Sequence, residues 1–400
     1  MIAKTPIRAA SIVPVTPSRV AGFLDFGSQN RFPQDLIKMV SGSITAGSCI
    51  KRRAQFISGN GFNRVDLSKL VVNRQRQTLD AVLRRTGWNV GFFECPALHI
   101  QYNGLGQTAG IRPIPVENVR LGKPDDFENI NTAGIFPYLD STVFKNRDKR
   151  NSKLTLFNPE IDVVRKEIEV AGGIDKYQGQ ILYLPMLSPG DYYYHFPDWF
   201  KAHTAIETEK ELNIFDLKQT TNSFAISGFA SYLAEENTND TDADELGSVN
   251  YRSGRDVDTD SIEYQYQQSI GNREAGSVVF NRFSTKEAMD SFKFEPVTGA
   301  QMSERNGSVN QRVPENICRS FEVPPSRVGL TRPSGLVSTG DMLREDVNNM
   351  YQSVNDYQRL IKEAFESVLN HWHTPLGEID LAIDPLDYFN EKKNVPVSGK

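Results

Sequence analysis

Two short patterns near the N-terminus bring together residue types that known active sites use. Gly42-Ser-Ile-Thr-Ala-Gly47 has the glycine spacing of a phosphate-binding loop, but Ser48 replaces the lysine that must reach the β- and γ-phosphates. Ser48 and Lys51 have the spacing of a serine acyl-transfer motif, but its companion motifs are missing. We therefore expect neither a nucleotide site nor a serine nucleophile here.

Acidic and imidazole side chains are the candidate cation ligands. Asp240–Asp244 and Asp256–Asp260 have alternating aspartates like the start of a calcium loop. The sixth position lacks the required glycine and the twelfth lacks the required glutamate (Glu245 and Tyr251 in the first repeat, Ser261 and Gln267 in the second). His371 and His373 lie at the end of an expected helix, where the helix dipole alone favours them. We expect no metal and no cofactor, with a weak cation site in the acidic loop left open.

Catalytic motifs are otherwise missing, since the chain has no G-x-S-x-G and no H-E-x-x-H pattern. Two basic clusters remain: Lys51-Arg52-Arg53, expected at a helix end, and a group within 145–153 (Lys145, Arg147, Lys149, Arg150 and Lys153). The second group is expected on a solvated surface, with contact to DNA or an acidic partner as the sharper alternative. The sequence thus indicates no catalytic residue and a protein that is not an enzyme.

Length, net charge and cysteine content limit the classes of protein to which the chain can belong. The 400 residues are enough for two or three packed regions, and 45 basic against 50 acidic side chains give a net charge of −5. This charge argues against a broad basic face that grips nucleic acid, but it permits DNA to slide past. Three scattered cysteines indicate a reducing compartment, and no apolar run approaches a membrane span or a secretory signal.

Hydrophobic periodicity predicts an α+β chain whose elements change character along its length. Helices are expected over 34–56, over 66–85 with Asp66 as N-cap and Gly87 as stop, and from Asp198 to Leu217. The intervening stretch 88–187 is rich in β-forming residues (strands at 92–102, 110–121, 143–157 and 179–184). Further strands are expected at 225–233, 277–282 and 291–296, with a polar loop over 235–275.

The last third has the most regular pattern. Apolar residues at helical spacing run from Met302 to Phe321, with a kink or restart expected at Pro314. Pro324 and Pro325 then break the helix, and a Gly- and Pro-containing loop follows over 326–337. Ser338-x-x-Asp341 is a capping box, and apolar residues every three or four positions to Trp372 predict one helix of more than thirty residues.

The order of these elements resembles that of portal proteins, the head–tail connectors of tailed bacteriophages, and in particular the short portals of the HK97 type. The most recognisable segment is Ile317-x-x-x-Phe321-x-Val323-Pro324-Pro325-x-x-x-Gly329. The other matching segments lie earlier in the chain: Gly27-Ser-Gln-Asn30-Arg-Phe32-Pro33, Ile57-Ser-Gly59-Asn-Gly61-Phe62, Tyr177-x-Gly179-x-Ile181-Leu-Tyr183, Ser188-Pro-Gly, Tyr192–Tyr194 and Phe196-Pro197. The likeness lies in the order and spacing of these motifs and covers most of the chain.

This resemblance implies a ring of about twelve copies around a DNA channel. It assigns a mixed α/β wing (1–197), stem helices (198–222 and 299–325), an α/β clip with the acidic loop (223–298), a tunnel loop (326–338), a long wing helix (339–373) and a short tail or residual crown (374–400). The implied channel-facing residues are Arg332, Pro333, Ser334, Gly335, Leu336 and Val337, and the implied structural ones are Phe321, Val323, Pro324, Pro325 and Gly329.

By the same resemblance the partners are the large terminase, the head–tail adaptor, the major capsid protein and double-stranded DNA, with no membrane. The protein would be assembled in the host cytoplasm and reside at a capsid vertex of the virion. Another structural ring protein of the virion, such as an adaptor or minor capsid component, is the main alternative. A hydrolase whose site residues are dispersed in the sequence is the second alternative.

Overall fold

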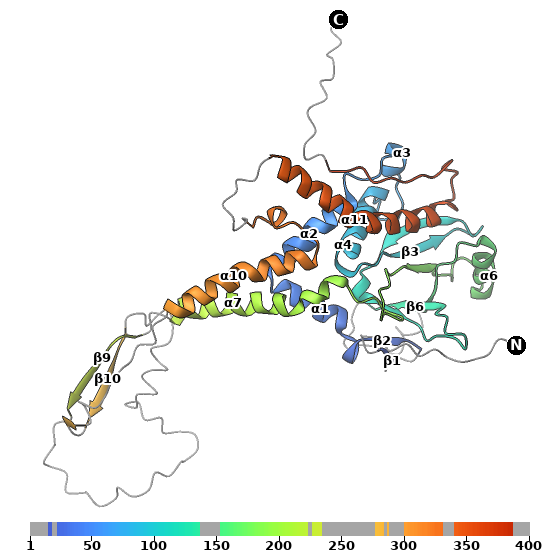
Figure 1. Ribbon diagram of the computed structural model, residues 1–400. Helices are drawn as coiled ribbons and strands as arrows, with labels where there is room; N and C mark the ends of the chain where they lie inside the picture. The colour runs from blue at the N-terminus through green and yellow to red at the C-terminus, as the bar shows by residue number, and fades with distance from the viewer. Residues whose placement is uncertain are drawn as a thin grey trace, which may run out of the picture. The chain divides into compact units, whose positions relative to one another are not determined.

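The computed structural model describes residues 15–17, 22–136, 153–222, 226–233, 277–283, 286–287, 300–330 and 340–386. The chain divides into two compact units, one of residues 1–207 with 312–400 and one of residues 208–311. Helices and strands are mixed along the chain, so the predicted α+β class is confirmed (Figure 1).

A six-stranded mixed sheet with the strand order β4-β3-β8-β7-β6-β5 forms one layer of the first unit. The strands are β3 Ala97–Tyr102, β4 Thr108–Pro113, β5 Val119–Leu121, β6 Thr132–Ile135, β7 Lys153–Leu156 and β8 Gln180–Tyr183. Only β7 and β8 pair in parallel, because helix α6, Ile161–Ala171, carries the chain back between them. The sequence pattern predicted this β-rich region but missed α6, which buries only Val164 and Ile168.

A short antiparallel pair, β1 Val15–Pro17 with β2 Leu24–Phe26, precedes the helices of this unit.

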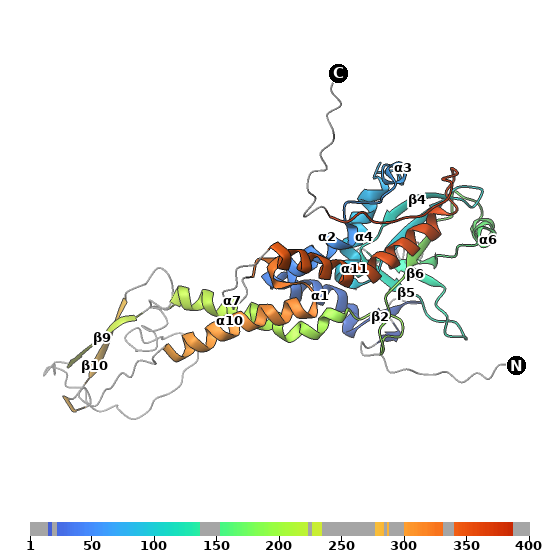
Figure 2. The ribbon, with the colours of Figure 1, turned by 45° about the horizontal axis from the view of Figure 1, so that its top comes forward.

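A helical layer covers one face of the six-stranded sheet. Helix α4, Leu79–Phe93, packs on β3 and β4, where Leu98, Ile100 and Ile111 are fully buried. Helix α2, Ile44–Ser58, packs on α4, and α11, Gly340–Leu369, lies across α2 (Figures 1 and 2). The predicted long C-terminal helix is therefore confirmed as a single helix, but it has 30 residues and ends at Leu369, before the predicted end at Trp372.

The expected single helix over 34–56 is wrong, because the chain forms two helices there. Helix α1, Phe32–Ser41, ends at Gly42, and Ser43 caps α2 by accepting a hydrogen bond from the Ala46 amide at 3.0 Å. The cluster Lys51-Arg52-Arg53 consequently lies inside α2 and not at a helix end, and Arg53 is buried.

The expected helix over 66–85 is also wrong. Only one turn, α3 Val65–Ser68, forms there, and α4 begins after Thr78. The Asn73 side chain accepts a hydrogen bond from the Gln77 amide at 3.1 Å, which fixes a turn that competes with the helix. The expected strand start at Phe92 is corrected as well, since Phe92 lies in the last turn of α4.

Gly87 does not stop α4, contrary to its predicted role, because it serves helix packing. A Cβ added at Gly87 would lie 3.3 Å from the Ala54 carbonyl oxygen, and one at Gly91 would lie 3.1 Å from the Ala54 nitrogen. These glycines therefore allow the backbones of α2 and α4 to approach closely. The helix ends instead at Glu94, which is in the left-handed conformation with φ 53°.

The second unit contains most of helix α7, His203–Asn222, and the first half of helix α10, Ala300–Ser320. The turn Asp198–Ala202 leads into α7, so this helix begins a few residues after the predicted position. Strands β9, Ile226–Leu233, and β10, Ser277–Phe283, confirm two predicted strands and form a parallel pair. The assigned helix α10 continues through Pro314, so the restart predicted there does not occur.

Several predicted features lie outside the described residues. They are the channel-facing candidates Arg332–Val337, Ser338 of the capping box, the polar loop 235–275 with its aspartate repeats, the strand 291–296, the basic residues 145–150 and the tail 387–400. Within the described ranges, no helix is long and apolar enough to cross a bilayer.

Candidate functional site

The segment before residue 331 begins with a well-defined helix stop. Helix α10 ends in a Schellman motif, in which the Val323 amide donates to the Cys318 carbonyl at 2.9 Å and the Glu322 amide to the Arg319 carbonyl at 3.2 Å. Glu322 adopts the left-handed conformation with φ 55°, a position that glycine usually fills. Pro324 follows immediately and prevents the helix from continuing.

The motif residues Phe321 and Val323 lie in the core of the first unit. Both side chains are buried, and the Phe321 ring stacks on Trp199 with a centroid distance of 5.1 Å. The Ser320 hydroxyl donates to the Trp199 carbonyl at 3.1 Å. The segment that leads into α7 is thereby packed against the end of α10. Pro325 opens the 3-10 turn Pro325–Val328, and Gly329, with φ 84°, closes it in the left-handed conformation.

This turn is held by α2 on one side and α11 on the other. The Arg52 Nε donates to the Arg327 carbonyl at 2.9 Å, and the Arg327 Nη2 donates to the Leu343 carbonyl at 2.5 Å. The Ser326 hydroxyl donates to the Asp346 carboxylate. The described chain on both sides of residues 331–339 is therefore anchored to the same body, which positions the ends of that segment.

A buried charge cluster lies in the same unit, next to Tyr357 of α11. It joins Arg53 of α2, Glu94 at the end of α4, Asp191 and His195 before α7, and Tyr357 of α11. Glu94 accepts from the Arg53 Nη2 at 2.8 Å, the His195 Nε2 at 2.8 Å, the Asp198 amide at 3.1 Å and the Tyr357 hydroxyl at 3.2 Å. The Arg53 guanidinium also lies over the Tyr357 ring, 4.3 Å from its centroid.

The geometry fixes the protonation state of His195. Its Nδ1 lies 2.7 Å from the Asp191 carboxylate and its Nε2 lies 2.8 Å from Glu94, so both nitrogens donate and the ring is an imidazolium. Burial lowers the pKa of His195, but the hydrogen bonds and charges of Glu94 and Asp191 outweigh it and raise the pKa above its ordinary value. Burial raises the pKa of Glu94, but His195 and Arg53 outweigh it and hold that pKa at about 2.

Two cations and two carboxylates thus compensate one another in a region closed to water. Such a cluster is suited to joining four segments in one arrangement and does not resemble a nucleophile with its base. No pattern in the sequence points to Glu94, His195, Asp191 or Tyr357. The one available signal was Arg53, whose neighbours made it look like part of a basic helix end.

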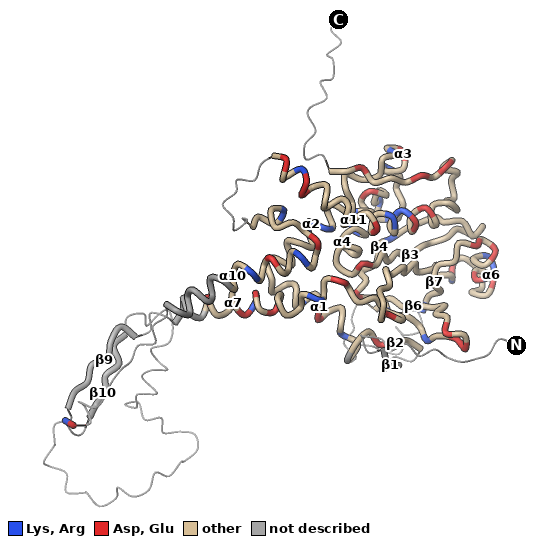
Figure 3. The backbone as a smooth tube through the Cα atoms, viewed as in Figure 1, with Lys and Arg blue, Asp and Glu red and all other residues tan. Residues whose placement is uncertain are grey.

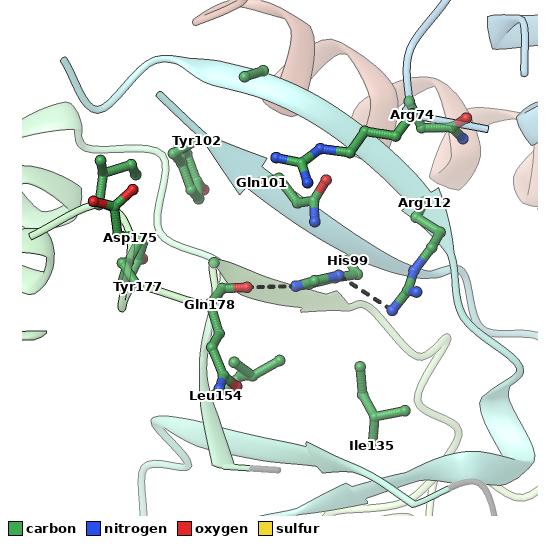
Figure 4. A pocket seen from close by; sticks show the side chains of 14 residues that line it. Arg74, His99, Gln101, Tyr102, Arg112, Ile135, Leu154, Asp175, Tyr177 and Gln178 are labelled. Carbon is green, nitrogen blue, oxygen red and sulfur yellow. Dashed lines mark hydrogen bonds between the residues drawn. The ribbon is translucent and has the colours of Figure 1, made fainter. Parts of the chain in front are cut away.

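A second feature is a cavity of about 630 Å³ on the other face of the sheet, the face turned away from α4 (Figure 4). His99 is buried at its base, and its Nε2 lies 2.7 Å from the Gln178 carbonyl, so this nitrogen carries the proton and donates. The Nδ1 accepts a weak contact from Arg112 at 3.4 Å, and burial lowers the pKa of His99. The exposed side chains of Arg74, Gln101 and Arg112 line the opening.

The predicted histidine pair does not come together as a ligand set. Helix α11 ends at Leu369, so His371 and His373 follow the helix and do not close it. The His373 Nδ1 lies 3.2 Å from the Thr108 carbonyl, which ties this segment to β4. In the part of the chain that the structure describes, no group of three His, Cys, Asp or Glu side chains could hold a metal ion.

Comparison with known proteins gives a likeness of fold only. No protein-family profile and no curated protein sequence matches the chain. Among solved structures, it is similar to a chain in the virion of a native gene transfer agent (GTA) particle, with a TM-score of 0.51 and 13% identity over 91% of this chain and 84% of that chain. It is also similar to a chain in the neck of an empty GTA particle computed with C6 symmetry, with a TM-score of 0.50 and 12% identity over 91% of this chain and 86% of that one.

Proposed function

We propose that this chain is a portal protein, one subunit of a ring at a single vertex of a phage-like capsid through which DNA is packaged and ejected. The observation that carries the proposal is the likeness of fold, over nine tenths of the chain, to chains in the virion and neck of GTA particles. The order of sequence motifs supports the same function independently, because it depends on the residues alone and not on the fold.

The site geometry agrees with a structural role. The segment 331–339 has both flanks fixed on one body by Arg52, Arg327 and Asp346. A loop that touches moving DNA needs such fixed ends, because otherwise force on the loop would displace it. We assign Arg332–Val337 to this tunnel loop, residues 1–197 and 339–373 to the wing, 198–222 and 299–325 to the stem, 223–298 to the clip, and 374–400 to a short tail or residual crown.

The proposal includes the partners of a portal: further copies of the chain, the large terminase, the head–tail adaptor, the major capsid protein and the DNA. It assigns no catalytic step to the chain. A different structural ring protein of the virion is the second candidate, and the likeness to a neck chain favours it equally.

Electron microscopy of the purified protein tests the proposal. We expect rings with a central hole wide enough for duplex DNA, and image classes that count the subunits. Packaging reactions with capsids that lack this protein then separate the two candidates, because a portal is needed before DNA enters and an adaptor only afterwards. A uniform monomer at high protein concentration, with and without scaffolding partners, would contradict both.

A further inference from the structure

The first unit presents a projection and a groove of opposite charge. The projection is the loop between β5 and β6, and its residues Asp125–Glu128 are here named the acidic finger. Figure 3 shows acidic residues at this loop beside β6, and basic residues beside α4 and β4. The opposite charges of the projection and the groove indicate that the two surfaces could bind each other.

The acidic finger is preorganised. The Asp125 carboxylate accepts from the Phe127 and Asn129 amides, both at 2.9 Å, and from the Asn131 side-chain amide at 3.1 Å. The Glu128 amide donates to the Asp125 carbonyl at 3.0 Å, which closes the turn. This frame holds Phe127 outward with 74% of its surface exposed, next to the exposed carboxylate of Asp126. A partner that covers this fixed ring gains buried apolar area with little further loss of conformational entropy.

The groove lies where the chain leaves β4, and residues of α4 and β6 also line it. It encloses about 440 Å³ between Arg85, Arg112, Pro113, Pro115 and Ile135, and is here named the arginine groove. Two arginines and several apolar residues thus line the same groove. Arg112 and Ile135 also line the larger cavity around His99, where the Arg112 Nη2 lies 3.4 Å from the His99 Nδ1, so the two cavities are neighbours.

The rim of the arginine groove has the composition of a protein interface. Arg84 and Arg85 are exposed on α4, and Trp88 follows one turn later with 49% of its surface exposed. None of Arg84, Arg85 and Arg112 forms an ion pair with another described residue. Arginine and tryptophan are among the residues most enriched at the centres of protein interfaces. The prolines that line the groove offer apolar contact area, which suits a protein partner better than a phosphate group.

The finger and the groove of one chain cannot meet. In the β5–β6 hairpin, Ile135 pairs with Val119 at one end, whereas the finger joins the strands beyond Leu121 and Ala133 at the other end. Ile135 faces the groove, so the finger points along the hairpin away from it. A contact between these surfaces therefore requires two copies of the chain.

We propose that the acidic finger of one copy docks in the arginine groove of a second copy, with Phe127 against Pro113, Pro115 and Ile135, and Asp126 beside Arg85 and Arg112. This contact joins two different surfaces, so it is head-to-tail and repeats around a closed ring. It rests on the proposed ring and specifies which surfaces make it. The aromatic anchor gives the affinity and the charges fix the register.

Cross-linking tests the contact directly. The paired variant Asp126→Cys with Arg112→Cys is treated with a short bismaleimide as assembled rings, and its native cysteines are all buried in the described structure. We expect a ladder of covalent oligomers on a denaturing gel. Each single variant should remain monomeric on that gel. The control pair, Asp126→Cys with Asp162→Cys on α6, should also remain monomeric. Asp162 is a suitable control because its side chain is 83% exposed.

Charge reversal gives a second, independent test should the paired cysteines disturb folding. Arg112→Glu or Asp126→Arg alone should raise the subunit concentration needed for assembly on the order of tenfold, and the double reversal should restore it. Sedimentation velocity measures both.

The outcomes separate this inference from the proposed function. If the wild-type protein forms rings but the paired cysteine variant gives no ladder, the finger contact is wrong and the portal assignment is unaffected. The same holds if the double charge reversal does not restore assembly. A wild-type protein that forms no ring overturns both. Binding of duplex DNA that is lost in Arg112→Glu, with assembly unchanged, would assign the groove to nucleic acid and overturn the inference.

Discussion

Glu94 is the side chain on which the buried charge cluster depends, because it alone touches both cations. It is fully buried and accepts hydrogen bonds from Arg53, His195, Tyr357 and the Asp198 amide. Its backbone also occupies the left-handed region, so one residue both ends α4 and supplies the counter-ion. The cluster is not a sign of high stability in itself, but removal of one partner leaves the others uncompensated.

Glu94→Gln should lower the free energy of unfolding by about 3–5 kcal/mol, because two buried cations then face one remaining carboxylate. Urea denaturation followed by circular dichroism measures the change. Glu363→Gln on the exposed face of α11 is the matched control and should stay within about 0.5 kcal/mol of wild type. Equal losses in the two variants would show that the charge of Glu94 is unimportant.

The cluster also predicts a pH window. The pKa of Glu94 is about 2 in the folded protein and about 4.3 unfolded, so its contribution is present above pH 4.3 and is lost as pH falls towards 2. The pKa of His195 is raised when folded, so its contribution is complete below about pH 6.5 and is lost as pH rises through the folded value. Stability should therefore peak between these limits.

Thermal melts across pH test this window. In His195→Gln the loss on the alkaline side should disappear while the loss on the acidic side remains. An alkaline loss of the same size in that variant would assign it to another group.

At the scale of elements, close approach of α2 and α4 organises the helical layer. Gly91→Ala should destabilise the protein by about 1–3 kcal/mol, although alanine is normally the better helix former, because its Cβ would lie 3.1 Å from the Ala54 nitrogen. Gly104→Ala, where a Cβ meets nothing within 4 Å, should change stability by less than about 0.5 kcal/mol. Denaturant midpoints for both variants decide whether this helix contact is as tight as described.

The anchored turn Pro325–Val328 precedes the segment 331–339, which we propose contains the tunnel loop. Deletion of Arg332–Val337 should therefore block DNA packaging or DNA retention while rings still form. DNA content of purified particles and microscopy of the rings measure the two effects. Normal packaging by the deletion variant would remove these residues from the channel.

For the whole molecule, net charge predicts how the ring that we propose would interact with DNA. Each copy carries −5, and twelve would carry about −60, which disfavours tight capture of a polyanion. Purified rings should bind linear duplex DNA no more tightly than about 10⁻⁶ M at physiological salt. Fluorescence anisotropy with labelled duplex measures this, and nanomolar binding that salt abolishes would reveal a gripping surface instead.

Local patterns in the sequence predict the features that depend on neighbours along the chain. The periodicity from Leu343 to Trp372 predicted the long helix, and Phe321 with Pro324 marked the end of α10, because helix packing faces and proline geometry are local properties. The order of these elements also indicated the fold that the comparison with solved structures supports.

Which distant residues meet becomes visible in the three-dimensional fold and not in any local pattern. Arg53, Glu94, His195 and Tyr357 look like ordinary surface or core residues in the sequence, and the pKa shifts of Glu94, His195 and Tyr357 arise because folding brings the four side chains together away from water. The sequence predicted Gly87 as a helix stop, whereas the structure packs it closely against α2. Arg112 lines the same groove as Arg85 of α4 and Ile135 of β6, which are distant from it in the sequence. Contacts between segments depend on the path of the whole chain, which no local pattern encodes.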